Sequence, residues 1–327
     1  AIGNSLFIAE GAHWRWQRRA ASPVFSHRNV QNLGPIMALA AERSVERLTA
    51  QQGRAVDLFE EMVATTFDVI SDVTFSGDDS VDRDAIHHAI DSYVSGTAKM
   101  SIMDILGVPT WVPRPGRFFT GNAMKQTKHI ADGAIDARRK SGPRPVKDLL
   151  DLLLEGEDPK TKRTMSTAEL RDNLLTFIVA GHETTALTLA WALYLCAFDS
   201  DVQDHARAEA QAVLGDRTAT AADVENLPYV RMIIDETLRL YPAAAFLSRT
   251  AQEPDTLCGR EVRKGDTVTL PIYALHRNAV IWDDPDAFRP EVFRWDAQVD
   301  IMYLALYGDV DRLTLQREAN DVRLKLS

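Results

Sequence analysis

The feature that most constrains the fold is one long, almost continuously apolar segment, from about Thr167 to Phe198. It begins with Ser166-Thr167-Ala168-Glu169, where a hydroxyl and a carboxylate three residues apart are typical of a helix capping box. At about 1.5 Å per residue, a helix of this length is roughly 45–50 Å long. Because its middle is apolar on nearly all faces, we expect several neighbouring elements to pack against it.

A membrane-spanning helix is the alternative for such a segment. His182 and Glu183 interrupt it at its centre, where a charge costs most in lipid. The sequence therefore favours a helix that is buried in a globular protein.

The rest of the sequence predicts a mainly α-helical protein with a small β region. Breaks near prolines separate amphipathic helical segments at 14–19, 34–51, 84–97, 121–140 and 146–155. Later in the chain, alternating segments predict short strands at 249–250, 261–263 and 267–270, with turns at Gly259 and 264–266. Two more alternating segments, 312–316 and 322–326, predict a terminal hairpin. We expect residues 1–327 to form a single domain.

Composition narrows the classes of function. Lysine and arginine number 37 against 47 for aspartate and glutamate, which gives a formal net charge of −10. Because an acidic protein has no general attraction for phosphate backbones, we expect no nucleic-acid partner. The two cysteines, Cys196 and Cys258, do not make a disulfide framework, which is typical of a reducing compartment. We therefore predict a cytoplasmic protein.

Residues 180–185, in the middle of the long segment, break several local rules together. A glycine costs about 1 kcal/mol in a helix interior, consecutive threonines bend helices, and a buried glutamate is expensive. Small Ala180 and Gly181 let a flat ligand approach the backbone closely. The Thr184 hydroxyl can then donate to that ligand, and Glu183 can relay protons to it. A helix kink lined by incidental polar residues is the alternative.

This Ala-Gly-x-Glu-Thr-Thr run is similar to the central motif of the cytochrome P-450 family. There the small residues make room for heme b (iron protoporphyrin IX), and the acid and the first threonine manage protons on bound oxygen. The resemblance implies cofactor-binding roles for Ala180 and Gly181 and catalytic roles for Glu183 and Thr184. It also implies the cytochrome P-450 fold, mainly α with a small β region.

Further motifs match the same family in the right order, from Gly11 to Phe293. Glu236 and Arg239, followed by Leu-Tyr-Pro, resemble the Glu-x-x-Arg signature, which serves the structure more than the chemistry. Residues 276–293 resemble the meander that precedes the heme loop. Val292 stands where the family usually has an arginine that completes a triad with the signature pair, and Arg294 is a candidate replacement.

The resemblance also assigns residues that would hold the heme propionates. Trp14 and Arg18 resemble the family's early helix, whose tryptophan and arginine meet these carboxylates. Arg249 falls where the family places another propionate-binding arginine. The planar guanidinium suits this role, because it pairs a carboxylate with two parallel hydrogen bonds.

The sequence departs from the family at the metal ligand, which is normally a cysteine thiolate in a Phe-x-x-Gly-x-x-x-Cys-x-Gly loop. Here Phe293 leads through residues 294–302 almost directly to the predicted hairpin, without that loop. Cys196 and Cys258 are interpreted as ordinary small hydrophobic residues, so we predict no metal ligand. A family member of this kind is also expected to have an N-terminal part before Ala1. The sequence is either part of a complete enzyme, or the protein lacks heme.

With a complete loop, the resemblance implies a heme-dependent monooxygenase that hydroxylates a small apolar molecule with O2. A ferredoxin or a flavoprotein reductase would deliver electrons, because no flavin or iron–sulfur motif occurs here. A heme-free binding or regulatory partner and a helical carrier of hydrophobic ligands are the alternatives. We expect His182 to face solvent or to pack against a helix.

Overall fold

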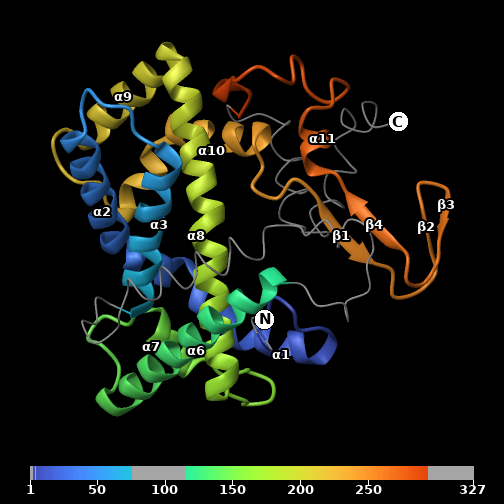
Figure 1. Ribbon diagram of the computed structural model, residues 1–327. Coiled ribbons are helices and arrows are strands. Elements are labelled where there is room, and N and C mark those ends of the chain that lie inside the picture. Colours follow the sequence, from blue (N-terminus) through green and yellow to red (C-terminus); the bar gives the residue numbers. More distant parts are fainter. Residues whose placement is uncertain (1–2, 4, 76–114, 294–327) are drawn as a thin grey trace. The chain divides into compact units, whose positions relative to one another are not determined.

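The computed structural model describes residue 3, residues 5–75 and residues 115–293 (Figure 1). These residues belong to two compact units. The first holds the chain up to Ala186 together with Thr218–Ala222, and the second holds Leu187–Arg217 and the chain from Asp223 onward. The single domain expected for residues 1–327 stays a prediction. The helix expected at 84–97 and the terminal hairpin lie outside the described residues.

The first unit is built from helices. They are α1 (Gly11–Ala21), a short 3-10 helix (Ser22–Phe25), α2 (His27–Ala50), α3 (Leu58–Phe75), α6 (Pro115–Ser141), α7 (Leu149–Glu155) and the first part of α8 (Thr167–Phe198). Figure 1 shows α2 and α3 side by side, with α3 next to α8. Burial of apolar side chains holds these helices together, and the core includes Trp16, Leu33, Phe67, Ile135, Leu150 and Leu174.

Helix α8 has the bounds that its apolar pattern predicts. The capping box is confirmed, because the Ser166 N–H donates to Glu169 Oε2 at 3.0 Å and the Glu169 N–H donates to Ser166 Oγ at 3.3 Å. Of the helices that the structure describes, none is long and apolar enough to cross a membrane. The capping bonds satisfy N–H groups that the first turn of a helix leaves without partners.

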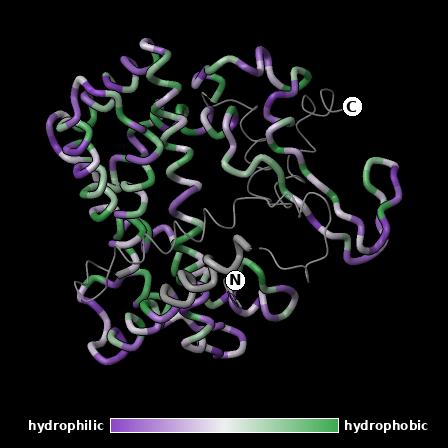
Figure 2. The backbone as a smooth tube through the Cα atoms, in the orientation of Figure 1, coloured by the Kyte–Doolittle hydropathy of each residue, from purple (hydrophilic) through white to green (hydrophobic). Residues whose placement is uncertain are grey.

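Other helix bounds differ from the predictions. Helix α2 begins at His27, ahead of the expected start at residue 34, and it carries Pro35 within it. Helix α6 ends where Gly142 adopts a φ of 81°, a conformation that glycine reaches without steric cost. Helix α3 was not predicted. Figure 2 shows polar and apolar residues mixed along α2 and α3, and the apolar period of α3 is interrupted by buried Thr65 and Thr66.

The second unit combines helices with short strands. It contains the end of α8, α9 (Ser200–Leu214), α10 (Pro228–Leu240), α11 (Ile272–His276) and a 3-10 helix (Pro290–Phe293), while the 3-10 helix Ala221–Asn226 contributes to both units. Glu209 of α9 accepts hydrogen bonds from the N–H groups of Tyr229 and Val230 at 2.8 and 3.0 Å. A carboxylate at this place is favourable, because the first N–H groups of α10 carry a partial positive charge.

The strands form two antiparallel pairs. Strand β1 (Leu247–Thr250) pairs with β4 (Thr267–Leu270), and β2 (Asp255–Leu257) pairs with β3 (Arg260–Val262). The predicted turns are confirmed, because Gly259 and Gly265 have φ angles of 74° and 92°. The three strands expected near 249, 261 and 267 are present, and β2 is an additional strand.

Candidate active site

The centre of α8 has two unlike faces. Ala180 and Thr184 are exposed, whereas His182 and Ala186 are buried. At about 100° per residue, His182 lies about 200° around the helix axis from both Ala180 and Thr184. The motif therefore presents a methyl group and a hydroxyl on an open face, and a packed face supports them from behind.

The Thr184 hydroxyl donates to the carbonyl oxygen of Ala180 at 2.7 Å. Such bonds from a threonine to the residue four places earlier compete with the helical pattern. A ligand on the open face would compete with this carbonyl for the hydroxyl proton. Glu183, the expected proton relay, is half-buried between the two faces.

Gly181 points toward α3 rather than toward the open face. A methyl group built on Gly181 would lie 3.6 Å from Cδ1 of Ile70, which is ordinary van der Waals contact. The packing between α3 and α8 thus leaves room for a methyl group at position 181. The expected role of Gly181 in admitting a flat ligand stays a prediction.

His182 packs against α3, as one of the two sequence expectations for it states. Its side chain is 3% exposed, and its ring meets the Phe67 ring edge to face, with centroids 5.7 Å apart and an interplanar angle of 86°. The Thr66 hydroxyl of α3 donates to the carbonyl oxygen of His182 at 3.0 Å. Thr66 lies outside the motifs that are visible in the sequence, and its one local signal is the threonine pair that it forms with Thr65.

Trp14 and Arg18 lie one turn apart on the exposed face of α1. The Arg18 side chain makes no hydrogen bond or ion pair with another described residue. The adjacent Arg19 behaves differently, because it donates to both carboxylate oxygens of the buried Asp158 at 2.7 Å. The Arg19 guanidinium holds the pKa of Asp158 well below its usual range. Arg18 is therefore free to meet a carboxylate from outside, and Arg19 is not.

Arg249 lies in the second unit, on strand β1, opposite Val268 of β4. Its side chain is exposed, and Nη1 donates to the carbonyl oxygen of Ser248 at 2.9 Å. The remaining N–H groups of the guanidinium make no hydrogen bond with the described residues. Arg249 thus retains donors that a carboxylate can use.

Glu236 and Arg239 form a buried ion pair on α10. Their side chains are 0% and 2% exposed. Arg239 Nε donates to Glu236 Oε2 at 2.6 Å, and Nη2 donates to Oε1 at 2.7 Å. Burial raises the pKa of Glu236, and the hydrogen bonds from Arg239 oppose that rise. The two residues to which the sequence analysis gave a structural role thus meet in the interior of the second unit.

Arg239 also holds the chain that follows α11. Its other N–H groups donate to the carbonyl oxygens of His276 at 2.9 Å, Pro285 at 2.7 Å and Ala287 at 2.9 Å. All five donors of the guanidinium are therefore used. His276 Nδ1 lies 3.2 Å from the Arg239 carbonyl oxygen, and the Trp282 ring centre lies 4.9 Å from the guanidinium carbon.

The backbone N–H of Arg289 donates to Glu236 Oε1 at 2.9 Å and occupies part of the carboxylate. Val292, which stands in place of the family's third residue, is half-buried in the 3-10 helix Pro290–Phe293. Arg294, the expected replacement, lies outside the described residues. Among the described residues, the backbone N–H of Arg289 thus donates to Glu236 where the family pattern would have an arginine side chain.

Neither cysteine is placed as a metal ligand. Cys196 is half-buried on the last part of α8, where burial and then Asp199 raise the pKa of its thiol. Cys258 is exposed in the turn between β2 and β3, with a φ of 49°. The described residues contain no cluster of three or more histidine, cysteine, aspartate or glutamate side chains that could hold a metal ion.

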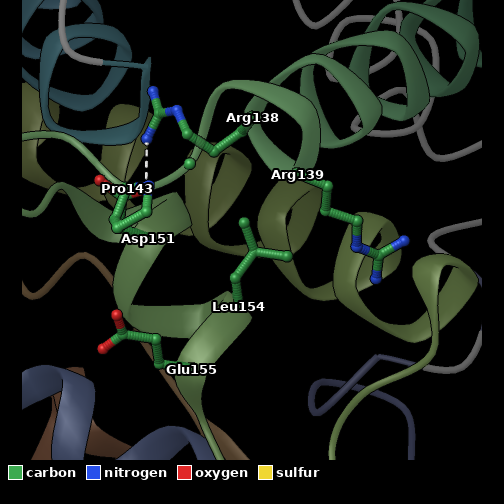
Figure 3. Close-up of a pocket in the computed structure, with 7 residues that line it drawn as sticks. Arg138, Arg139, Pro143, Asp151, Leu154 and Glu155 are labelled. Atoms are coloured by element: carbon green, nitrogen blue, oxygen red, sulfur yellow. Dashed lines mark ion pairs between the residues drawn. The ribbon is translucent and has the colours of Figure 1, made fainter.

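A pocket of about 270 Å³ lies away from the motif, where the end of α6 meets α7 (Figure 3). Arg138 lines it, donates a hydrogen bond to Asp148 Oδ1 at 2.8 Å, and forms an ion pair with Asp151 Oδ1 at 2.8 Å. Because these three side chains are almost fully buried and pair with one another, the polar groups of this wall serve the helix packing.

Comparison with known proteins identifies the family of this chain. The family model described as cytochrome P450 matches residues 1–302. The chain belongs to the cytochrome P450 family. The solved structure of the cytochrome P450DA heme domain superposes with a TM-score of 0.79 at 29% identity, covering 91% of this chain and 65% of that chain. The predicted fold class is thereby confirmed.

Curated relatives include bacterial enzymes. Cyclooctat-9-en-7-ol 5-monooxygenase of Streptomyces melanosporofaciens is 33% identical over 90% of this chain and 63% of its own length. Bifunctional cytochrome P450/NADPH–P450 reductase 2 of Bacillus subtilis is 31% identical over 89% of this chain and 28% of its own length. The chain spans about 63% of the length of the first of these relatives.

Proposed function

We propose that the protein acts as a heme-dependent monooxygenase that hydroxylates a small apolar molecule with O2. The observation that carries the proposal is the open face of α8, where Ala180 and Thr184 are exposed directly opposite the buried His182. The family membership and the monooxygenase among the relatives support the same reaction class.

The described side chains fit the propionate groups of heme, but they do not supply the thiolate ligand of its iron. Exposed Arg18 and Arg249 have donors suited to propionates, Trp14 lies beside Arg18, and Ala180 leaves space on α8. A thiolate ligand for heme is not supplied by the described cysteines, because Cys196 is half-buried on α8 and Cys258 lies in the turn between β2 and β3. Heme b would therefore need a thiolate beyond the two cysteines of this sequence.

The proposed roles follow from the positions of the side chains. Bound heme supplies the oxygen binding and electron transfer that introduce oxygen into a C–H bond. Thr184 would hold a proton at Oγ1 and donate it on the open face, giving up its bond to the Ala180 carbonyl. Glu183, half-buried beside it, would replace that proton from solvent.

The proposed partners are a small apolar substrate, O2 and an electron donor, either a ferredoxin or a flavoprotein reductase. The name of the Bacillus subtilis relative includes a reductase, which supports the need for an electron donor without distinguishing the two classes. The unpaired cysteines support the proposed cytoplasmic location.

The carbon monoxide difference spectrum of the reduced, purified protein tests this function. A red-shifted Soret band of the kind for which the family is named is the expected result, because it reports a thiolate-ligated heme. A protein without any heme band would contradict the proposal and would favour a binding or regulatory role.

A further inference from the structure

Helix α3 packs against the buried face of the motif. Phe67 meets the His182 ring, and Ile70 lies behind Gly181. Thr66, one residue before Phe67, adds a polar contact to the same surface through its bond to the His182 carbonyl. Three side chains of α3 thus lie against the centre of α8.

The position of Thr66 is unusual for a helical threonine. Its side chain is buried, at 4% exposure, and its hydroxyl lies 2.9 Å from the Met62 carbonyl oxygen, 3.2 Å from that of Val63 and 3.0 Å from that of His182. A hydroxyl has one proton to donate. Donation to His182 therefore competes with bonds inside α3, and it links segments that are 116 residues apart.

The acceptor is the peptide group that precedes Glu183. Because a peptide unit is planar, the His182 carbonyl and the Glu183 N–H turn together. A bond that holds the carbonyl therefore holds the start of Glu183, and Thr184 follows one residue later. The contact is buried, where a hydrogen bond is less exposed to competition from water.

We propose that Thr66 is a positioning residue for the oxygen motif. By donating to the His182 carbonyl, its hydroxyl fixes the peptide plane between His182 and Glu183 and keeps Thr184 turned to the open face. The hydrogen bond between Thr66 and His182 does not depend on heme. Its consequence for catalysis rests on the proposed function.

Amide hydrogen exchange across residues 180–188 tests the contact in the full chain, with or without heme. Thr66→Val keeps the shape of the side chain and removes the donor, so exchange in this segment should rise roughly three- to tenfold. Thr66→Ser keeps a hydroxyl and should restore slow exchange. Unchanged exchange in Thr66→Val would mean that the hydroxyl bonds only within α3, and the inference would fail.

Thr176→Val is the matched control. Thr176 is also buried, and its hydroxyl donates to the Asp172 carbonyl oxygen of its own helix at 2.7 Å. This variant should leave exchange at residues 180–188 unchanged. If Thr66→Val and Thr176→Val accelerated amide exchange at residues 180–188 equally, the cause would be a general loss of stability. That result would overturn the positioning role of Thr66.

The catalytic consequence has a separate measurement in the heme-loaded protein. Thr66→Val should release more peroxide per electron pair consumed, with heme content unchanged and with recovery in Thr66→Ser. Altered exchange together with unaltered coupling would overturn the link to catalysis. Failure to load heme would count against the proposed function alone, because the exchange result is read without heme.

Discussion

The arginines of this protein fall into two contrasting environments. Arg239 is buried in the second unit, and every N–H of its guanidinium has an acceptor within the chain. Arg18 in the first unit and Arg249 in the second are exposed, and both have donors that no described residue uses. All three belong to motifs of the same family.

The contrast separates an arginine that stabilises the fold from arginines whose proposed role is to bind a ligand. A buried guanidinium without acceptors would be costly, so Arg239 must be satisfied as soon as the chain folds. Water satisfies an exposed guanidinium at little cost, and a ligand carboxylate can replace that water. All the guanidinium donors of Arg239 are used inside the fold, whereas the two exposed arginines of the family motifs keep donors that a ligand can use.

The largest effect is expected when the buried pair is broken. Arg239→Met leaves the Glu236 carboxylate and three carbonyl oxygens without their donor, so the free energy of unfolding should fall by about 3–5 kcal/mol. Urea denaturation measures this loss.

The matched control lies on the same helix. Arg231 pairs with Asp235 at 3.7 Å and is 61% exposed. Arg231→Met should change the free energy of unfolding by less than about 0.5 kcal/mol. Equal losses in the two variants would remove the distinction between saturated and exposed arginines.

A second test concerns the exposed arginine of α1. Arg18→Met should leave the unfolding midpoint nearly unchanged and weaken heme retention roughly ten- to a hundredfold, the effect of one lost charge-assisted bond. The pyridine hemochrome assay gives the heme content. Arg15→Met, on the same helix and also exposed, is the control. Retention lost equally in both variants would argue against a specific propionate contact.

Thr184→Ala tests the open face of α8. Without the hydroxyl, product per electron pair should fall about tenfold and released peroxide should rise, which corresponds to about 1.4 kcal/mol. Peroxide and product assays measure this ratio, with Thr185→Ala as the neighbouring exposed control. Unchanged coupling in Thr184→Ala would refute its proposed role.

The smallest effect is a pH dependence in the second unit. Burial lowers the pKa of His276 below its usual 6.5. The folded protein therefore binds a proton at His276 less readily than the unfolded chain does. As the pH falls below the unfolded pKa of about 6.5, protonation favours the unfolded chain, and the free energy of unfolding should decrease. In His276→Gln, the melting temperature should change less between pH 7.5 and pH 5.5 than in the wild type. The difference should correspond to less than about 1 kcal/mol in the free energy of unfolding. The exposed His205→Gln should retain the wild-type slope.

Local features of the fold were predictable in detail. Helix α8 has the bounds and the capping box that its sequence predicts, and the turns at Gly259 and Gly265 have the expected positive φ angles. Helix α3 was not predicted from the sequence, because the buried residues Thr65 and Thr66 interrupt the periodic pattern of its apolar residues. The Thr65 hydroxyl donates to the Glu61 carbonyl oxygen of the same helix, whereas the Thr66 hydroxyl also reaches the His182 carbonyl oxygen, which a linear pattern does not reveal.

The sequence named the residues of the candidate site, and their roles stay predictions, whereas their arrangement could not be read from the sequence. The sequence by itself determined the motif on α8 and the family to which it belongs, because helix periodicity and residue spacing are local properties. Only the tertiary structure decided that His182 is buried while Thr184 is exposed, and that Thr66 reaches the motif from 116 residues away. Burial and hydrogen-bond partners depend on which helices pack together, and packing joins residues that are far apart in the chain.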